Sequence, residues 1–96
     1  MNELNELKIL WGRFLGNIPS DQQFDFWVMT HGLDLIHQGI LKTIQKNLSM
    51  GGTMSNDHKI RFASKVMLTQ QARNVENAAN RARLNDEFVY GTRGNQ

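Results

Sequence analysis

Apolar side chains recur at helical spacing along most of the chain, and turn-forming residues interrupt the pattern three times. The first apolar set lies three or four residues apart and consists of Leu4, Leu7, Trp11 and Phe14. Because such spacing places side chains on one face of a helix, it predicts an amphipathic helix over about residues 3–15. Gly16 permits a left-handed ending, and Pro19 prevents simple continuation.

Two further helices are predicted between Pro19 and the glycine pair that follows Met50. Ser20 and Gln23 have the spacing of a capping box, so a second helix begins here and ends by Gly32. Gly51 can adopt a left-handed cap and ends the third helix. The apolar face of this third helix is formed by Leu33, Ile36, Ile40, Ile44 and Leu48.

The last predicted helix begins after Ser55, a natural N-cap, with Asp57 in its first turn. Large apolar residues become sparse from Gln70 onward, and residues 85–96 carry glycines and polar groups that favour a flexible tail. The fold class is therefore all-α, a compact bundle of about four helices with a long basic C-terminal helix and a flexible tail. Residues 1–69 form the helical body, and residues 70–96 form the basic extension and tail. The predicted core consists of Leu7, Trp11, Phe14, Phe24, Trp27, Ile36, Ile40 and Ile44.

Composition limits the chain to one small domain and excludes several classes of chemistry. Its 96 residues are 40% hydrophobic and 21% charged, within the range of globular proteins. The absence of cysteine excludes a disulfide scaffold, a thiolate zinc site and thiol catalysis. The N-terminus does not resemble a secretory signal, and charged and polar residues interrupt the apolar stretch 24–41. We therefore expect a cytoplasmic protein with no membrane partner.

Catalytic and cofactor chemistry has little support in the sequence. His31 and His37 lie six residues apart, which does not place them on one helical face as metal ligands. No nucleophile and base pair and no nucleotide-binding loop is recognisable, because the glycines after Met50 lack the strand and lysine of such a loop. We expect no enzyme activity, no catalytic residue, no cofactor and no metal.

Charge is distributed unevenly along the chain, although the formal net charge is only +2. Residues 1–48 contain four Lys or Arg and five Asp or Glu, whereas residues 49–96 contain seven and four. A basic half of this kind favours a polyanionic partner, most plausibly nucleic acid. The predicted nucleic-acid-binding residues are Lys59, Arg61, Lys65, Arg73, Arg81 and Arg83. The alternative interpretation is that these residues form an ordinary solvated helix face.

The chain also resembles the DnaD-like domain of bacterial and phage replication-initiation proteins over about residues 11–70. The resemblance lies in the runs from Trp11 to Leu15 and from Ser20 to Phe24, followed by Trp27, Leu35, Ile36, Gly39, Ile40, Thr43 and Asn47. It implies a compact helical domain with a DNA-binding C-terminal helix that acts in helicase loading or primosome assembly. Phe62 and Val66 match the first two positions of the family's closing motif, and Gln70 stands where the family has tryptophan.

Two functions of different classes therefore remain open. In the first, the protein is a small nucleic-acid-binding helical protein, a replication-associated accessory factor in line with the resemblance. In the second, it is a protein-protein adaptor or a homo-oligomer whose last helix packs against another helix. The residues that would allow close helix packing are Ala72, Val75, Ala78, Ala79 and Ala82.

Overall fold

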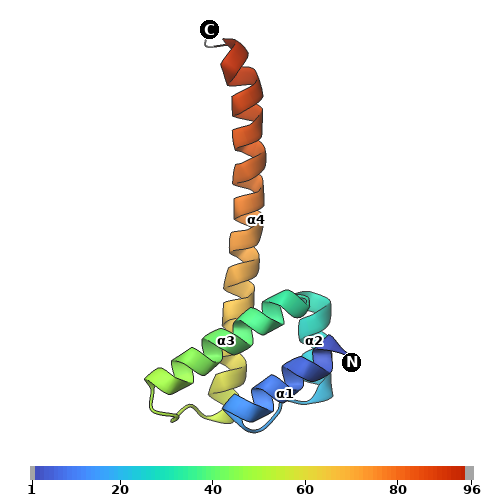
Figure 1. Ribbon diagram of the computed structural model, residues 1–96, viewed down its shortest axis with the longest axis vertical. Coiled ribbons are helices and arrows are strands. Elements are labelled where there is room, and N and C mark those ends of the chain that lie inside the picture. The colour runs from blue at the N-terminus through green and yellow to red at the C-terminus, as the bar shows by residue number, and fades with distance from the viewer. Residues whose placement is uncertain (1, 95–96) are drawn as a thin grey trace.

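The computed structural model describes the backbone of residues 2–94 and the side chains of residues 2–79. The described residues form an all-α fold of four helices joined by short connections (Figure 1). The helices are α1 (Glu3–Leu15), α2 (Asp21–Thr30), α3 (Leu33–Ser49) and α4 (Asn56–Gly94). These bounds confirm the predicted all-α bundle of about four helices.

Side chains of polar residues begin three of the helices as the sequence predicts or permits. The Asn2 side chain accepts a hydrogen bond from the amide of Leu4 at the start of α1. Ser20 Oγ accepts one from the amide of Gln23 at 3.1 Å, and Ser55 Oγ accepts one from the amide of His58 at 3.1 Å. Each contact satisfies an amide that the first helical turn leaves without a backbone partner. The predicted caps Ser20 and Ser55 are confirmed.

Glycines with positive φ angles separate α2, α3 and α4. Gly32 has φ 90° and forms the whole connection between α2 and α3 together with His31. Gly51, at φ 68°, follows the C-cap of α3, and the amide of Gly52 donates to the carbonyl of Asn47 at 2.8 Å. Because other residues rarely adopt these angles, the glycines fix where α3 begins and ends.

Three buried aromatic rings form the centre of the core. Trp11 from α1 lies 5.8 Å from Trp27 of α2, and Phe24 lies edge-on to Trp27 at 5.3 Å, measured between ring centroids. Both indole nitrogens have acceptors: Trp11 donates to the carbonyl of Asn17, and Trp27 donates to Ser64 Oγ of α4, each at 2.9 Å. The rings therefore join α1, α2 and α4 without leaving a buried donor unpaired.

The core otherwise agrees with the predicted set except at one position. Leu7, Ile36 and Ile40 are buried as expected, and Ile44 is half-buried against the core. Phe14 was expected in the core, and this prediction is wrong because its side chain is 53% exposed. Leu15 takes the place of Phe14, since the buried positions of α1 lie four residues apart, at Leu7, Trp11 and Leu15. Side chains four residues apart lie on one face of a helix, and Phe14 points away from the face formed by Leu7, Trp11 and Leu15.

The apolar face of α3 is shorter than the sequence pattern indicates. Leu48 is 73% exposed, because the last turn of α3 extends beyond the helices that cover its earlier turns (Figure 1). The pattern also gave no sign of Leu35, which is buried. Further along the chain, Met54 in the connection to α4 is buried as well. The core is thus displaced toward the beginning of α3 and the beginning of α4.

The closest helix contact lies where α3 crosses α4. A Cβ atom added to Gly39 would stand 2.9 Å from Met67 Cε and 3.2 Å from the carbonyl oxygen of Ala63. Thr43, one turn further along α3, is fully buried and donates its hydroxyl hydrogen to the carbonyl of Gly39 at 2.7 Å. Small side chains on both helices therefore allow the two backbones to approach one another.

Beyond this crossing, α4 leaves the body. Gln71 makes the last described hydrogen bonds to the body: its Nε2 donates to the carbonyl of Thr30 at 3.2 Å, and its Oε1 lies 2.7 Å from His31 Nδ1. The helix passes residue 69 without a break, and its backbone is helical to Gly94, whereas the sequence predicts a flexible tail from residue 85. The flexibility itself stays a prediction. The radius of gyration, 18.2 Å, reflects this extension, because a compact chain of this length has about 12.5 Å.

The buried tryptophan of α2 gives the first prediction. Trp27→Ala should lower the free energy of unfolding by about 3 to 5 kcal/mol, because it removes a fully buried ring and leaves Ser64 without its donor. Phe26→Ala, one residue away and 58% exposed, is the matched control and should cost less than about 1 kcal/mol. Urea denaturation of both variants measures the difference, and equal losses would contradict the described core.

The helix crossing gives the second prediction. Gly39→Ala should destabilise the protein by about 1 to 3 kcal/mol, because the added methyl group must displace Met67 and the Ala63 carbonyl. Helix propensity alone predicts the opposite sign, a gain of about 1 kcal/mol. Gln38→Ala at the exposed neighbouring position should change stability by less than about 0.5 kcal/mol. Thermal unfolding of the two variants decides between packing and propensity.

Candidate nucleic-acid interface

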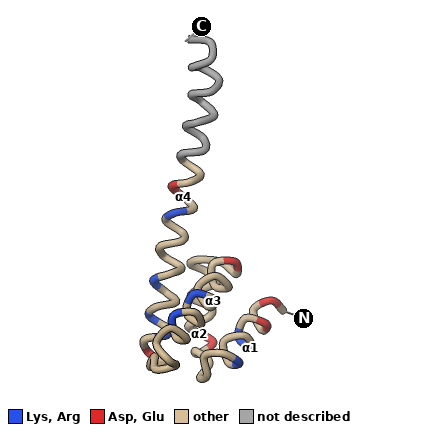
Figure 2. The backbone as a smooth tube through the Cα atoms, turned by 60° about the vertical axis from the view of Figure 1, so that its left-hand side comes forward, with Lys and Arg blue, Asp and Glu red and all other residues tan. Residues whose placement is uncertain are grey.

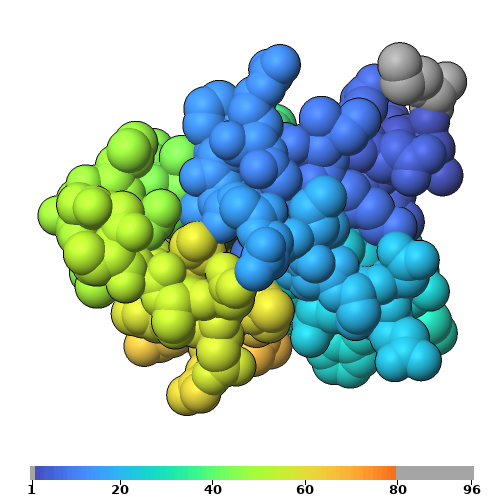
Figure 3. All heavy atoms as spheres, turned by 90° about the horizontal axis from the view of Figure 1, so that it is seen from below, coloured from blue at the N-terminus to red at the C-terminus, as the bar shows by residue number. Residues whose placement is uncertain are grey.

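The four predicted basic residues whose side chains are described, Lys59, Arg61, Lys65 and Arg73, differ in their surroundings, and Lys59 lies apart from the other three. Its ammonium group is half-buried and donates to the carbonyl of Leu15 at 2.5 Å, at the C-terminal end of α1. Figure 3, viewed from the end at which α4 begins, shows the start of α4 (yellow) between the α3–α4 loop and the α1–α2 connection. A cation in this position satisfies a carbonyl that the end of α1 leaves unpaired. Lys59 thus has a structural role.

Arg61 is exposed but has a partner on its own helix. Its guanidinium forms an ion pair with Asp57, four residues earlier, and both side chains are largely exposed. An exposed pair of this kind contributes little to stability, but Asp57 offsets the positive charge that Arg61 would offer to an anion. Arg61 and Lys65 lie on one face as predicted, and both line a hollow between α2 and α4 that Asp57 also lines.

Lys65 and Arg73 lie near a third basic residue, Lys42, which is not among the predicted nucleic-acid contacts. Lys42 of α3 lines the same hollow of about 240 Å³ as these two residues of α4. We call this site the basic hollow. Its other lining residues are Phe62, Val66, Thr69 and Gln70. The hollow thus presents three positive charges from two helices around an apolar and amide surface.

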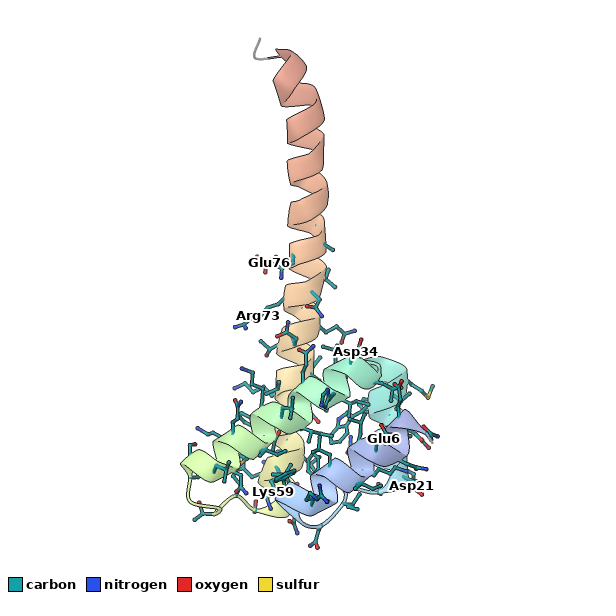
Figure 4. All side chains as sticks on the ribbon, viewed as in Figure 1. Glu6, Asp21, Asp34, Lys59, Arg73 and Glu76 are labelled. Carbon is teal, nitrogen blue, oxygen red and sulfur yellow. The ribbon has the colours of Figure 1, made fainter. Side chains whose placement is uncertain are left out.

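The charged residues that line the basic hollow are all positive. None of its described lining residues is acidic, and Lys46 is exposed one turn beyond Lys42 on α3. Glu76 is the nearest acidic residue along α4, and no ion pair between it and Arg73 occurs in the described part of the chain. Figure 4 shows Arg73 and Glu76 extending from the same side of α4, above its crossing with α3.

Acidic residues gather on another side of the body. Glu3, Glu6 and Asp34 line a separate hollow between the starts of α1 and α3, together with His37. Figure 2 shows the Lys and Arg positions of α3 and α4 near one another and the acidic starts of α1 and α3 apart from them. Because these acidic side chains lie apart from the basic hollow, a polyanion meets attraction at the hollow and repulsion at the starts of α1 and α3.

Two of the predicted nucleic-acid contacts, and part of the chain in which a metal site could occur, lie outside the described side chains. The side chains of Arg81 and Arg83 lie outside the described residues, so their role as nucleic-acid contacts stays a prediction. Within residues 2–79, no group of three His, Asp or Glu side chains is placed to hold a metal ion. Of the histidines, His31 contacts Gln71, and His58 is exposed at the start of α4.

Comparison with known proteins gives no relative from which a site can be transferred. No protein-family model, no curated protein and no solved structure matches this chain. Within the described part of the chain, no helix combines the length and the apolar character needed to cross a membrane. The residues of the basic hollow are therefore the features of this chain that indicate a function.

The hydrogen bond of Lys59 to the end of α1 predicts that this lysine, unlike Lys65, contributes to stability. Lys59→Met should lower the free energy of unfolding by about 1 to 2 kcal/mol, because the carbonyl at the end of α1 loses a charged donor. Lys65→Met, at an exposed position on the same helix, should change stability by less than about 0.5 kcal/mol. Urea denaturation compares the two, and a larger loss for Lys65→Met would contradict this assignment.

Proposed function

We propose that this protein binds nucleic acid through the basic hollow at the crossing of α3 and α4. The observation that carries the proposal is the convergence of Lys42, Lys65 and Arg73 on one hollow with no acidic lining residue. Lysine and arginine contacts to phosphates supply affinity by releasing counterions, and they carry little sequence information. The expected activity is therefore salt-sensitive binding with weak sequence preference.

The spacing of the cations suits a phosphate backbone. Lys65 and Arg73 are eight residues apart on α4, which corresponds to about 12 Å along the helix axis. At that separation the two side chains meet different phosphates of one strand. Lys42 approaches from α3, across the hollow, so the strand contacts both helices.

The interior of the hollow favours a single strand over a duplex. Phe62 is half-buried there beside Val66, which leaves an apolar surface between the charges. A base that is free of a duplex can pack against such a surface, whereas a stacked and paired base cannot reach it. Thr69 and the Gln70 amide add polar groups at the same place.

The resemblance to the DnaD-like family supports DNA as the polymer and replication as the process. Phe62, Val66 and Gln70, the positions of the family's closing motif, all line the basic hollow. Gln70 also donates from Nε2 to Asn74 Oδ1 at 3.1 Å, so an amide pair occupies the place of the family's tryptophan. We therefore propose weaker base stacking in this chain than a tryptophan would give, with phosphate contacts dominating.

The proposal predicts a specific loss of binding. Lys65→Gln combined with Arg73→Gln should weaken binding to a labelled single-stranded oligonucleotide about tenfold at low salt and reduce the slope of log K against log salt by about 1.4. Lys42→Gln alone should reduce the slope by about 0.7, although it lies on a different helix. Fluorescence anisotropy across a salt series, with single-stranded DNA, duplex DNA and RNA of equal length, measures these values.

A control variant with the same change in net charge distinguishes binding at the basic hollow from attraction by the overall charge of the protein. Arg13→Gln combined with Arg61→Gln removes the same two charges from exposed positions outside the hollow and should leave the slope nearly unchanged. Equal losses for the two double variants would mean that only net charge matters. Unchanged binding by the Lys65 and Arg73 variant would reject the basic hollow as the binding site.

A further inference from the structure

A second face of α4 is apolar and has no partner within the described residues. Leu68, Ala72, Val75 and Ala79 follow one another at spacings of four, three and four residues, and Ala82 continues the spacing in the sequence. We call this face the α4 seam. Leu68 is 60% exposed and Val75 is 67% exposed, although both are large apolar residues. The spacing is that of the a and d positions of a heptad repeat, which keeps its apolar side chains toward a facing helix.

Most of the seam lies where α4 has no helix of the body beside it, so its apolar side chains do not stabilise the helix by packing. Gln71 is the last described residue that bonds to the body, so most of the seam lies on the part of α4 that leaves it. Helices obtain most of their stability from packing of an apolar face, and Asn74 and Asn77 in this stretch have low helix propensity. A helix of this composition therefore needs a partner along its apolar face.

We propose that the partner is a second copy of this chain, whose α4 packs antiparallel against the seam. A heptad seam is complementary to another helix with the same spacing, and a twofold axis lets one surface serve both copies. Small and large residues alternate along it, with alanine at 72 and 79 and larger side chains at 68 and 75. Packing is best where large residues face small ones.

The sizes of the seam side chains and the charge of Lys65 both favour an antiparallel pair of α4 helices over a parallel one. With the twofold axis between Ala72 and Val75, Leu68 of each copy faces Ala79 of the other, and Ala72 faces Val75. A parallel pair would instead place equal residues opposite one another. It would also bring the two Lys65 side chains together, because Lys65 precedes Leu68 by three residues on the same face. The antiparallel pair separates these charges.

The body offers apolar surface beside the seam. Phe26 of α2 is 58% exposed and, with Ile60 and Leu68 of α4, forms the apolar part of a hollow that polar residues, among them Lys65, also line. The second copy's helix, running antiparallel along the seam, passes over this hollow. Stable interfaces bury about 800 Å² on each partner, and the hollow enlarges the surface that the seam alone provides.

The molar mass in solution tests the proposal. The full-length chain should sediment as a dimer with twice the monomer mass of 11.0 kDa. Val75→Glu should give the monomer mass at micromolar concentrations, because it places a charge in the seam. Asn77→Glu adds the same charge on the opposite face of α4, and it should remain dimeric. A concentration-independent monomer mass for the unmodified chain would overturn the proposal, as would a dimer that Val75→Glu leaves intact.

Engineered disulfides test the direction of the pair, since the chain contains no cysteine. Under mild oxidation, Leu68→Cys alone should not cross-link, because antiparallel packing places the two residues far apart along the axis. A mixture of Leu68→Cys with Ala79→Cys should give the mixed cross-linked dimer. Cross-linking of Leu68→Cys with itself would show a parallel pair and overturn the antiparallel arrangement. Circular dichroism of each variant shows whether the fold is retained.

Discussion

The close contact of α3 with α4 at Gly39 is the constraint on which the rest of the structure depends. Because Gly39 has no side chain, Met67 and the backbone of Ala63 approach α3 directly. The crossing brings Lys42 to the same hollow as Lys65 and Arg73, and it sets the direction in which α4 leaves the body. One additional carbon atom at this point would meet Met67 and the Ala63 carbonyl oxygen, so the Met67 side chain or the backbone of α4 would have to shift.

Both α1 and α2 are tied to α4 by polar contacts in addition to the core, and α3 packs against α4 at Gly39. Trp27 donates from α2 to Ser64, Lys59 of α4 donates to the end of α1, and Gln71 bonds to the end of α2. The first part of α4 is therefore the common element of the fold. Different faces of this one helix form part of the core, of the basic hollow and of the exposed seam. We therefore expect substitutions at neighbouring positions of α4 to affect stability, nucleic-acid binding or self-association separately.

The sequence predicted the helices well, but it identified only some of the residues that line the basic hollow. Glycine, proline and serine act locally, so Gly16, Ser20, Gly51 and Ser55 marked the ends of the helices correctly. Phe14 was misplaced because periodicity defines an apolar stripe but not which edge of it faces the neighbouring helix. Lys42 was missed because its proximity to Lys65 depends on the crossing of two helices, and no spacing along one helix contains that information. The sequence predicts Lys59 as a nucleic-acid contact and does not indicate its hydrogen bond to Leu15, because that carbonyl belongs to a distant part of the chain.

The anchoring of only the first turns of α4 has a consequence for how the helix forms. Starting a helix in water is unfavourable because several residues must be fixed before the first hydrogen bond is made, whereas adding further residues is nearly neutral. In this protein the body fixes the turns between Asn56 and Gln71 through the core and the contacts to α1 and α2. The folded body thus acts as a permanent nucleus from which the rest of α4 propagates. Any partner that binds along it needs to supply only the small free energy of propagation, residue by residue.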